Sequence, residues 1–170
     1  MCVAMGSVRL AGVERACALW IPVRLPGLNE LVAARARRGS VRSGTGKRWS
    51  AYSDIKRAAQ ETISACALAQ HFQAPEGPCH FNYLFCEPEQ KRWRRDPSNI
   101  LAGGQKLIED ALVSSGLLKG DGPDVVAGIT AYFLQRKPEG VFVLLQDCPV
   151  ISMRVMTERL YAYGQNGRQS

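Results

Sequence analysis

The sequence lacks several features that would mark common classes of protein. Its six cysteines contain no CxxC pair, whereas a structural zinc site usually needs two closely spaced ligand pairs. No hydrophobic run approaches the length of a membrane-spanning helix. Charged residues precede any long apolar run near the N-terminus, so the pattern does not predict a signal peptide. We therefore expect a cytoplasmic protein in which most cysteines are small core residues in a reducing compartment.

Acidic residues are also missing from Leu31 to Ser53, and this absence leaves a strongly basic segment. Its six cations are Arg35, Arg37, Arg38, Arg42, Lys47 and Arg48. Three glycines favour a mobile loop, and Trp49 and Tyr52 follow with rings on which bases can stack. We interpret the segment as a phosphate-binding loop. A solvated basic loop without a partner is the plain alternative.

The charge of the whole chain agrees with this interpretation. The 22 lysines and arginines exceed the 15 acidic residues, which gives a net charge of +7. Such an excess favours a polyanionic partner, and nucleic acid is preferred to a membrane because no basic helix with a strong apolar face is present. Charge that only keeps the protein soluble would explain the same excess.

The length of 170 residues favours a single domain. Apolar patterns predict strands at 16–23, 79–86, 125–135 and 140–146, and helices at 53–70 and 97–115. The last two strands, separated by a short turn at 136–139, are expected to form a hairpin. The order β-α-β-α-β-β predicts an α+β single domain with one mixed sheet covered by helices. This domain would occupy residues 16–147, between a leader at 1–15 and a C-terminal extension at 148–170.

The residues that suggest chemistry lie between positions 91 and 124. Four cations come first: Lys91, Arg92, Arg94 and Arg95. Asp96 and Pro97 then begin a predicted helix, where Asp is a favoured N-cap and Pro a favoured first residue. Asn99, Lys106 and Asp110 are spaced seven and four residues apart, so they share one stripe of that helix. A surface ion pair between Lys106 and Asp110 is the plain explanation of part of this pattern.

A glycine-rich loop after the helix carries two more carboxylates, Asp121 and Asp124. Asp in such a loop is usually explained by turn chemistry. We expect the loop to return the chain toward the start of the helix, so that Asp96 and Asp121 converge. Carboxylates are the hard oxygen ligands that Mg²⁺ or Mn²⁺ prefers, and such a metal activates water for phosphodiester hydrolysis.

This segment resembles the core of the RusA-type Holliday-junction resolvases, a family of small homodimeric, Mg²⁺-dependent endodeoxyribonucleases. That family has an Arg-rich loop, an Arg-Asp-x-Asp-Asn motif, a helix with Lys four residues before Asp-Ala-Leu, and a closing acidic pair. Residues 95–99 match the first motif, Lys106 and residues 110–112 match the helix, and Asp121 matches the closing pair. The resemblance spans roughly residues 18–146. Ser98 stands where the family has its second catalytic Asp, and Gly120 replaces the first member of the closing pair.

The resemblance implies roles for these residues. Asp96 and Asp121 would be metal-binding catalytic carboxylates, and Lys106 a positioning or charge-stabilising cation. Because Ser98 supplies no carboxylate, Asn99, Asp110 or Asp124 would have to compensate, and we expect Asp110 and Asn99 as further metal ligands. The cofactor would be Mg²⁺, with Mn²⁺ as an alternative. A homodimer would cleave branched DNA such as four-way junctions in recombination or repair, and would hold phosphates with the basic residues of 35–48 and 91–95.

Two other functions fit the same sequence. A serine hydroxyl cannot supply the charge of a carboxylate, so a catalytically impaired junction- or DNA-binding protein on the same scaffold is the first alternative. A basic structural or RNA-associated protein, in which every acid is a cap or a turn residue, is the second.

Overall fold

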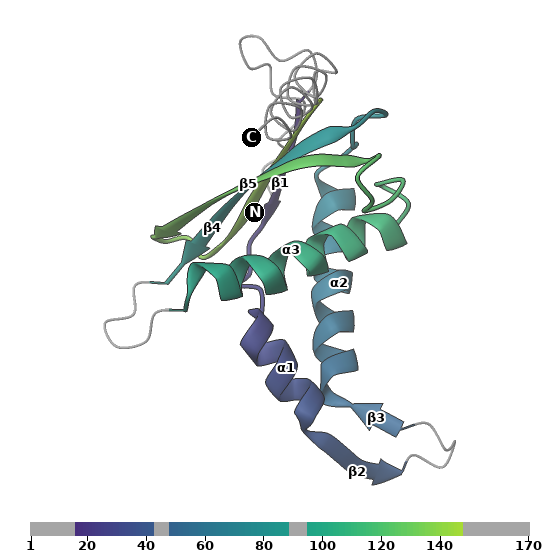
Figure 1. Ribbon diagram of the computed structural model, residues 1–170, viewed down its shortest axis with the longest axis vertical. Helices are drawn as coiled ribbons and strands as arrows, with labels where there is room; N and C mark the ends of the chain where they lie inside the picture. Colours follow the sequence, from purple (N-terminus) through teal and green to yellow (C-terminus); the bar gives the residue numbers. More distant parts are fainter. Residues whose placement is uncertain (1–15, 43–47, 89–94, 148–170) are drawn as a thin grey trace, which may run out of the picture.

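The computed structural model describes residues 16–42, 48–88 and 95–147. Its elements, in chain order, are β1 (Ala16–Ile21), α1 (Leu28–Ala36), β2 (Arg38–Arg42), β3 (Arg48–Ser50), α2 (Ala51–Ala69), β4 (Cys79–Glu87), α3 (Pro97–Ser114), β5 (Val126–Gln135) and β6 (Gly140–Asp147) (Figure 1). The predicted α+β class is confirmed. None of the described helices is long and apolar enough to span a membrane. The predicted leader and C-terminal extension lie outside the described residues.

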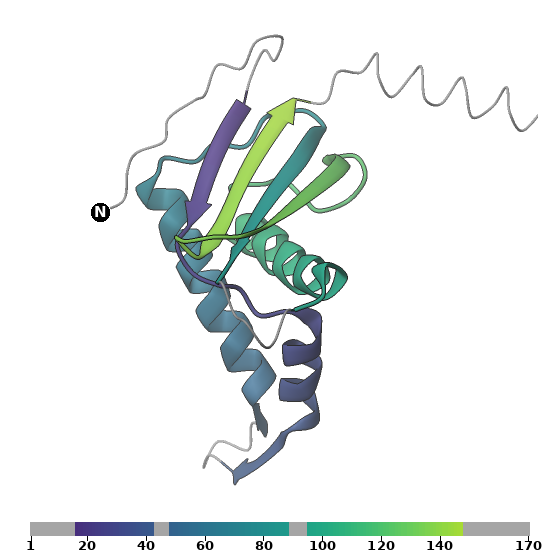
Figure 2. The same cartoon turned by 90° about the vertical axis from the view of Figure 1, so that its left-hand side faces the viewer.

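A four-stranded mixed sheet forms the centre of the fold, in the order β1-β6-β4-β5. β6 is antiparallel to both β1 and β4, whereas β5 is parallel to β4. Helices α2 and α3 lie against the same face of this sheet (Figure 2). The strands alternate accordingly: Phe81, Tyr83 and Phe85 of β4 are buried under the helices, and the residues between them are only partly buried.

The predicted hairpin between the last two strands is wrong, because β4 lies between them. Phe85 is paired with Phe133 of β5 on one side and with Val141 of β6 on the other. The connection at 136–139 therefore crosses the end of β4. Gly140 begins β6 with a φ of +153°, a conformation that side chains disfavour, and a β-carbon there would lie 2.7 Å from the Trp20 ring.

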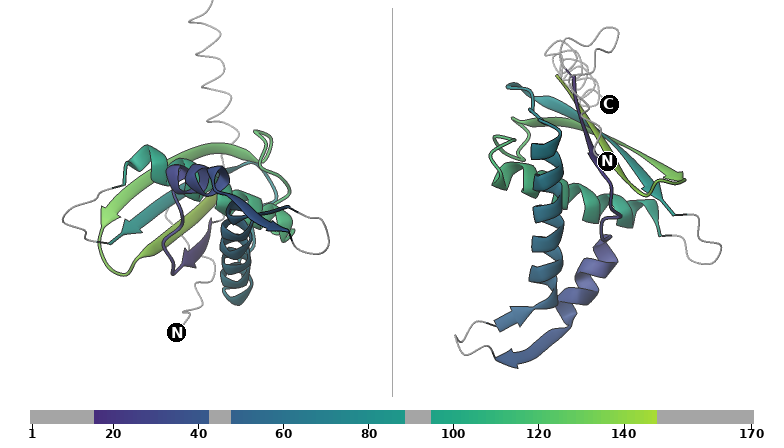
Figure 3. Two further views of the ribbon diagram at one scale, coloured as in Figure 1. Left: turned by 90° about the horizontal axis from the view of Figure 1, so that it is seen from below. Right: turned by 180° about the vertical axis from the view of Figure 1, so that it is seen from behind.

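The basic segment is more regular than the predicted loop. It contains α1 and a short antiparallel pair, β2 and β3, and α2 begins at Ala51 instead of residue 53. Ser50 is the N-cap of α2, since its hydroxyl accepts a hydrogen bond of 3.2 Å from the Ser53 amide. Together α1, β2, β3 and the first half of α2 project from the sheet (Figures 1 and 3), and we call them the basic arm.

Helix α3 approaches its neighbours closely through Gly103 and Gly104. A β-carbon at position 103 would lie 2.5 Å from the Pro26 carbonyl oxygen, and one at position 104 would lie 2.7 Å from the Phe85 ring. Leu112, two turns further along, is fully buried in the core. The position of α3, which carries most of the predicted site, is thus fixed against both the β1–α1 connection and β4.

Candidate functional site

Two lysines and two aspartates form an alternating cluster beside the second half of α3. The Nζ atom of Lys106 lies 2.8 Å from Oδ1 of Asp110 and 2.5 Å from Oδ2 of Asp121. The Nζ atom of Lys56, which comes from α2, lies 2.7 Å from Oδ2 of Asp110. We call Lys56, Asp110, Lys106 and Asp121 the Lys–Asp cluster. Its members come from two helices and from the loop that follows α3.

Local chemistry brings the loop back to the helix. α3 ends at Ser114, and Gly116 follows with a φ of +71° that favours glycine. The amides of Leu117 and Leu118 both donate to the Leu112 carbonyl oxygen, and the Leu118 side chain is buried. The chain therefore turns back immediately after the helix and carries Asp121 to Lys106.

Contacts within the cluster favour the charged forms of Lys106, Asp110 and Asp121. The hydrogen bond from Lys106 lowers the pKa of Asp121. Burial by itself would raise the pKa of Asp110, but hydrogen bonds from Lys106 and Lys56 outweigh it and lower that pKa as well. The same bonds to Asp110 and Asp121 raise the pKa of Lys106. Two positive charges thus balance two negative charges.

One side of the cluster is accessible to a large ligand. The side chains of Lys106 and Asp121 are 59% and 44% exposed, whereas that of Asp110 is only 17% exposed. The position of the Asp110 carboxylate is therefore the most constrained by its neighbours, whereas Lys106 and Asp121 are in contact with solvent.

Sequence reasoning missed Glu109, which lies beside this cluster. Oε1 of Glu109 accepts hydrogen bonds of 3.0 Å from the Tyr83 hydroxyl and 3.0 Å from the Gln105 amide. Burial raises its pKa, and the charges of Lys106 and Asp121 also act on it. A Glu directly before Asp110 was a visible signal, but its buried tyrosine partner comes from another element.

Asp96, the N-cap of α3, lies in a different setting. Its carboxylate accepts a hydrogen bond of 2.9 Å from the Ser98 amide, and Pro97 is the first helical residue, which confirms the predicted cap. Asp96 precedes Lys106 by ten residues, or about 15 Å of helical rise. Lys106 extends to Asp110, one turn further from Asp96. The structure thus does not join Asp96 to Asp121, and the described residues contain no group of three His, Cys, Asp or Glu side chains suited to a metal ion.

Asn99, expected to lie on the same stripe of the helix as Lys106, has a structural role. Its Oδ1 atom accepts a hydrogen bond of 2.6 Å from the Asn29 amide at the start of α1, and its side chain contacts Gly27. Seven residues place it about 10 Å along the helix axis from Lys106. Sharing a stripe therefore did not place it in the Lys–Asp cluster.

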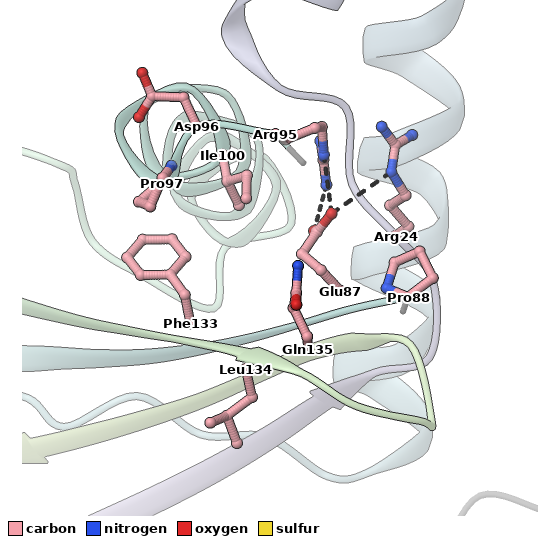
Figure 4. Close-up of a pocket in the computed structure, with 10 residues that line it drawn as sticks. All are labelled: Arg24, Glu87, Pro88, Arg95, Asp96, Pro97, Ile100, Phe133, Leu134 and Gln135. Atoms are coloured by element: carbon pink, nitrogen blue, oxygen red, sulfur yellow. Dashed lines mark hydrogen bonds and ion pairs between the residues drawn. The ribbon is translucent and has the colours of Figure 1, made fainter. Parts of the chain in front are cut away.

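Arg95, expected to bind DNA, is largely covered and is paired within the fold. Its guanidinium pairs with both oxygens of Glu87, by Nε at 2.9 Å and by a second, shorter contact, and donates to the Leu25 carbonyl oxygen at 2.8 Å. Its side chain is 13% exposed. This pair lines a pocket of about 460 Å³. In Figure 4 the Asp96 carboxylate points away from the pair.

The other predicted DNA-binding residues gather on the basic arm where they are described. Arg35 and Arg37 are exposed at the end of α1. Arg38 and Arg42 lie in β2, and Arg42 is opposite Arg48 of β3. Lys47, Lys91, Arg92 and Arg94 lie outside the described residues.

Comparisons with known proteins do not extend this description. The sequence matched no protein-family model, and a search of curated proteins found no match. Since a fold alone does not define an activity, the function must be argued from the site.

Proposed function

We propose that the protein is a Mg²⁺-dependent endodeoxyribonuclease of branched DNA, with Asp110 and Asp121 as its metal-binding carboxylates. The observation that carries this proposal is the bridging of the two carboxylates by a single ammonium, that of Lys106. The proposal keeps the reaction implied by the resemblance. Of the expected metal ligands it keeps Asp110 and Asp121, and it omits Asp96 and Asn99.

The donor set suits the cation. One oxygen of each carboxylate contacts the same Nζ atom, at 2.8 and 2.5 Å, so the distance between these two oxygens cannot exceed the sum of the two contacts. Mg²⁺ binds oxygen at about 2.1 Å and commonly uses one or two carboxylates, completed by water and substrate phosphate. When bound, the metal would lower the pKa of a water and stabilise charge on the scissile phosphate.

The remaining residues of the cluster have supporting roles. Lys56 would hold the orientation of Asp110 through its 2.7 Å ion pair. The Lys106 ammonium lies between the two carboxylates, so it would move aside when the metal binds and would then add positive charge beside the phosphate. The basic arm would bind the DNA backbone, so affinity should fall steeply with salt.

The decisive experiment measures Mg²⁺-dependent nicking of a synthetic four-way junction. Asp110→Asn and Asp121→Asn should each lower the rate more than about 100-fold, since even outer-shell partners of a metal contribute 10- to 100-fold. Asp54→Asn is the matched control, because Asp54 is an α2 carboxylate that also pairs with a cation, Arg57. Asp96→Asn should retain cleavage. Loss of activity in Asp96→Asn together with full activity in Asp110→Asn would overturn the assignment.

A junction-binding protein without cleavage is the second candidate. It is favoured by the pairing of both carboxylates with lysines and by Ser98, which supplies no charge near Asp96. Its signature would be junction binding that is independent of metal, with no nicking in Mg²⁺ or Mn²⁺. Ser98→Asp would then test whether a second acid at the start of α3 creates an active site there.

A further inference from the structure

The pocket beside the start of α3 has an apolar part and a polar part. Pro97, Ile100 and Phe133 lie together in one part of it, and Glu87 and Gln135 lie in the other (Figure 4). Phe133 and Gln135 are two residues apart on β5, so both point to the helix side of the sheet. The volume of about 460 Å³ is within the range of pockets that bind small ligands, about 300–1,000 Å³.

The apolar part is held in place by the core. The Phe133 ring is stacked on the ring of the buried Phe85, with centroids 5.5 Å apart and planes inclined by 10°. Phe133 itself is only partly buried, whereas Ile100 is a core residue with 4% of its surface exposed. These side chains offer a preformed apolar surface to a flat ring, which can stack there without burying an unpaired polar group.

The polar part offers one uncommitted amide. Both oxygens of Glu87 accept hydrogen bonds from the Arg95 guanidinium. The Gln135 side chain, in contrast, has no hydrogen-bond partner among the residues that the structure describes. Its amide has a donor and an acceptor side by side, a pattern that pairs with two adjacent atoms of a nucleobase and best with N6 and N7 of adenine. Arg24, whose side chain is 35% exposed, adds a cation.

We propose that this pocket binds one unpaired nucleobase of a DNA strand, with adenine favoured. The base would stack on Phe133, pair with the Gln135 amide and carry its phosphate toward Arg24. An aliphatic ligand would leave the amide unpaired, and a cationic ligand would meet the guanidinium of Arg24. The inference rests on the proposed function, which supplies the DNA ligand, and adds to it a subsite that recognises a base.

The pocket is separate from the Lys–Asp cluster. None of the four residues of the cluster lines the pocket. Ile100 precedes Lys106 by six residues, which is about 9 Å of helical rise. Binding of a base would therefore position the strand without contacting the proposed metal ligands, so the two sites can be tested independently.

Binding of short single-stranded oligonucleotides in EDTA, measured by fluorescence anisotropy, tests the proposal. A strand with one adenine among abasic positions should bind the wild type about 10-fold more tightly than a fully abasic strand of the same length. Both strands carry the same phosphates, so the difference reports the base alone. Thymine at the same position should bind about 5-fold less tightly than adenine, because it does not match the Gln135 amide as well.

Two variants locate this preference in the pocket. Gln135→Leu should remove most of the preference for adenine over thymine, and Phe133→Leu should lower the advantage of both bases over the abasic strand. Gln73→Leu is the matched control, since Gln73 is an exposed amide after α2 that does not line the pocket. Gln135 is also exposed, so its leucine variant should remain folded, which circular dichroism checks.

Three results would overturn the inference. They are equal affinity of the wild type for the three strands, a base preference that survives in both pocket variants, and binding of free deoxyadenosine as tight as that of the adenine strand, which would make a free nucleoside the ligand. Because the assay involves no metal and no cleavage, a base preference without nicking would contradict only the proposed reaction. Nicking of junctions without a base preference would contradict only the base-binding pocket.

Discussion

The residues just before helix α3 and those beside its second half are similarly charged but lie in different settings. At the beginning, the Asp96 carboxylate caps the helix, and the adjacent Arg95 joins Glu87 to the Leu25 carbonyl oxygen with 13% of its side chain exposed. In the second half, Lys106 pairs with Asp110 and Asp121 and remains 59% exposed. The first group holds the backbone together, whereas in the second Lys106 and Asp121 meet the solvent and only Asp110 is largely covered.

This difference shows how a charged motif can be divided between structure and chemistry. A buried ion pair that also satisfies backbone groups is costly to break, since the remaining partner is left desolvated. An exposed pair contributes little to stability and remains available to a ligand. We therefore expect substitutions of Arg95 and Asp96 to affect mainly folding, and those in the Lys–Asp cluster to affect mainly activity.

The largest effect on stability is expected for Arg95→Met. Removing the guanidinium leaves Glu87, whose side chain is only 15% exposed, with its 3.8 Å ion pair to Arg24 alone, so the free energy of unfolding should fall by about 1–3 kcal/mol. Urea denaturation measures this change. Arg57→Met is the control: Arg57 is 66% exposed, and its loss should cost less than about 0.5 kcal/mol. Equal losses of stability in Arg95→Met and Arg57→Met would contradict the distinction between a covered ion pair and an exposed one.

A smaller effect separates the two roles available to Asp96. Asp96→Ala should lower the free energy of unfolding by about 1 kcal/mol, because the Ser98 amide loses its acceptor. Asp96→Asn should be nearly neutral, since Asn caps helices as well as Asp does. If Asn destabilised the protein as much as Ala, the carboxylate charge, and not the cap, would be the important property.

The smallest effect concerns the acid stability of the Lys–Asp cluster in metal-free buffer. The pKa of Asp110 is lowered in the folded protein, so the unfolded chain binds its proton first, at about pH 4. The stabilisation by Asp110 is thus complete above about pH 4 and is lost as the pH falls through the lowered folded pKa. Asp110→Asn should flatten this acid limb by less than about 1 kcal/mol. Denaturation midpoints measured across acidic pH test it, with the 73% exposed Glu61, as Glu61→Gln, for control.

Several elements were predictable because their signals are local. The alternation of β4 and the Asp-Pro start of α3 lie within a few residues of the structures that they specify. The neighbours of a strand are not local in this way. Residues 125–146 resemble a hairpin, and only the insertion of β4 between β5 and β6 separates them. Similarly, the glycines of residues 39–46 suggested a loop, whereas β2 and β3 pair across them.

In the candidate site, too, local contacts were predictable and contacts between distant residues were not. The sequence by itself determined the Lys106–Asp110 pair, because residues four apart on a helix are neighbours wherever the helix lies. It also determined the Asp96 cap and the excess of positive charge. Only the tertiary structure decided that Asp121 and Lys56 join this pair, that Asp96 and Asn99 do not, and that Arg95 is tied to Glu87. Those contacts depend on the path of the backbone between distant residues, which the packing of the helices on the sheet sets.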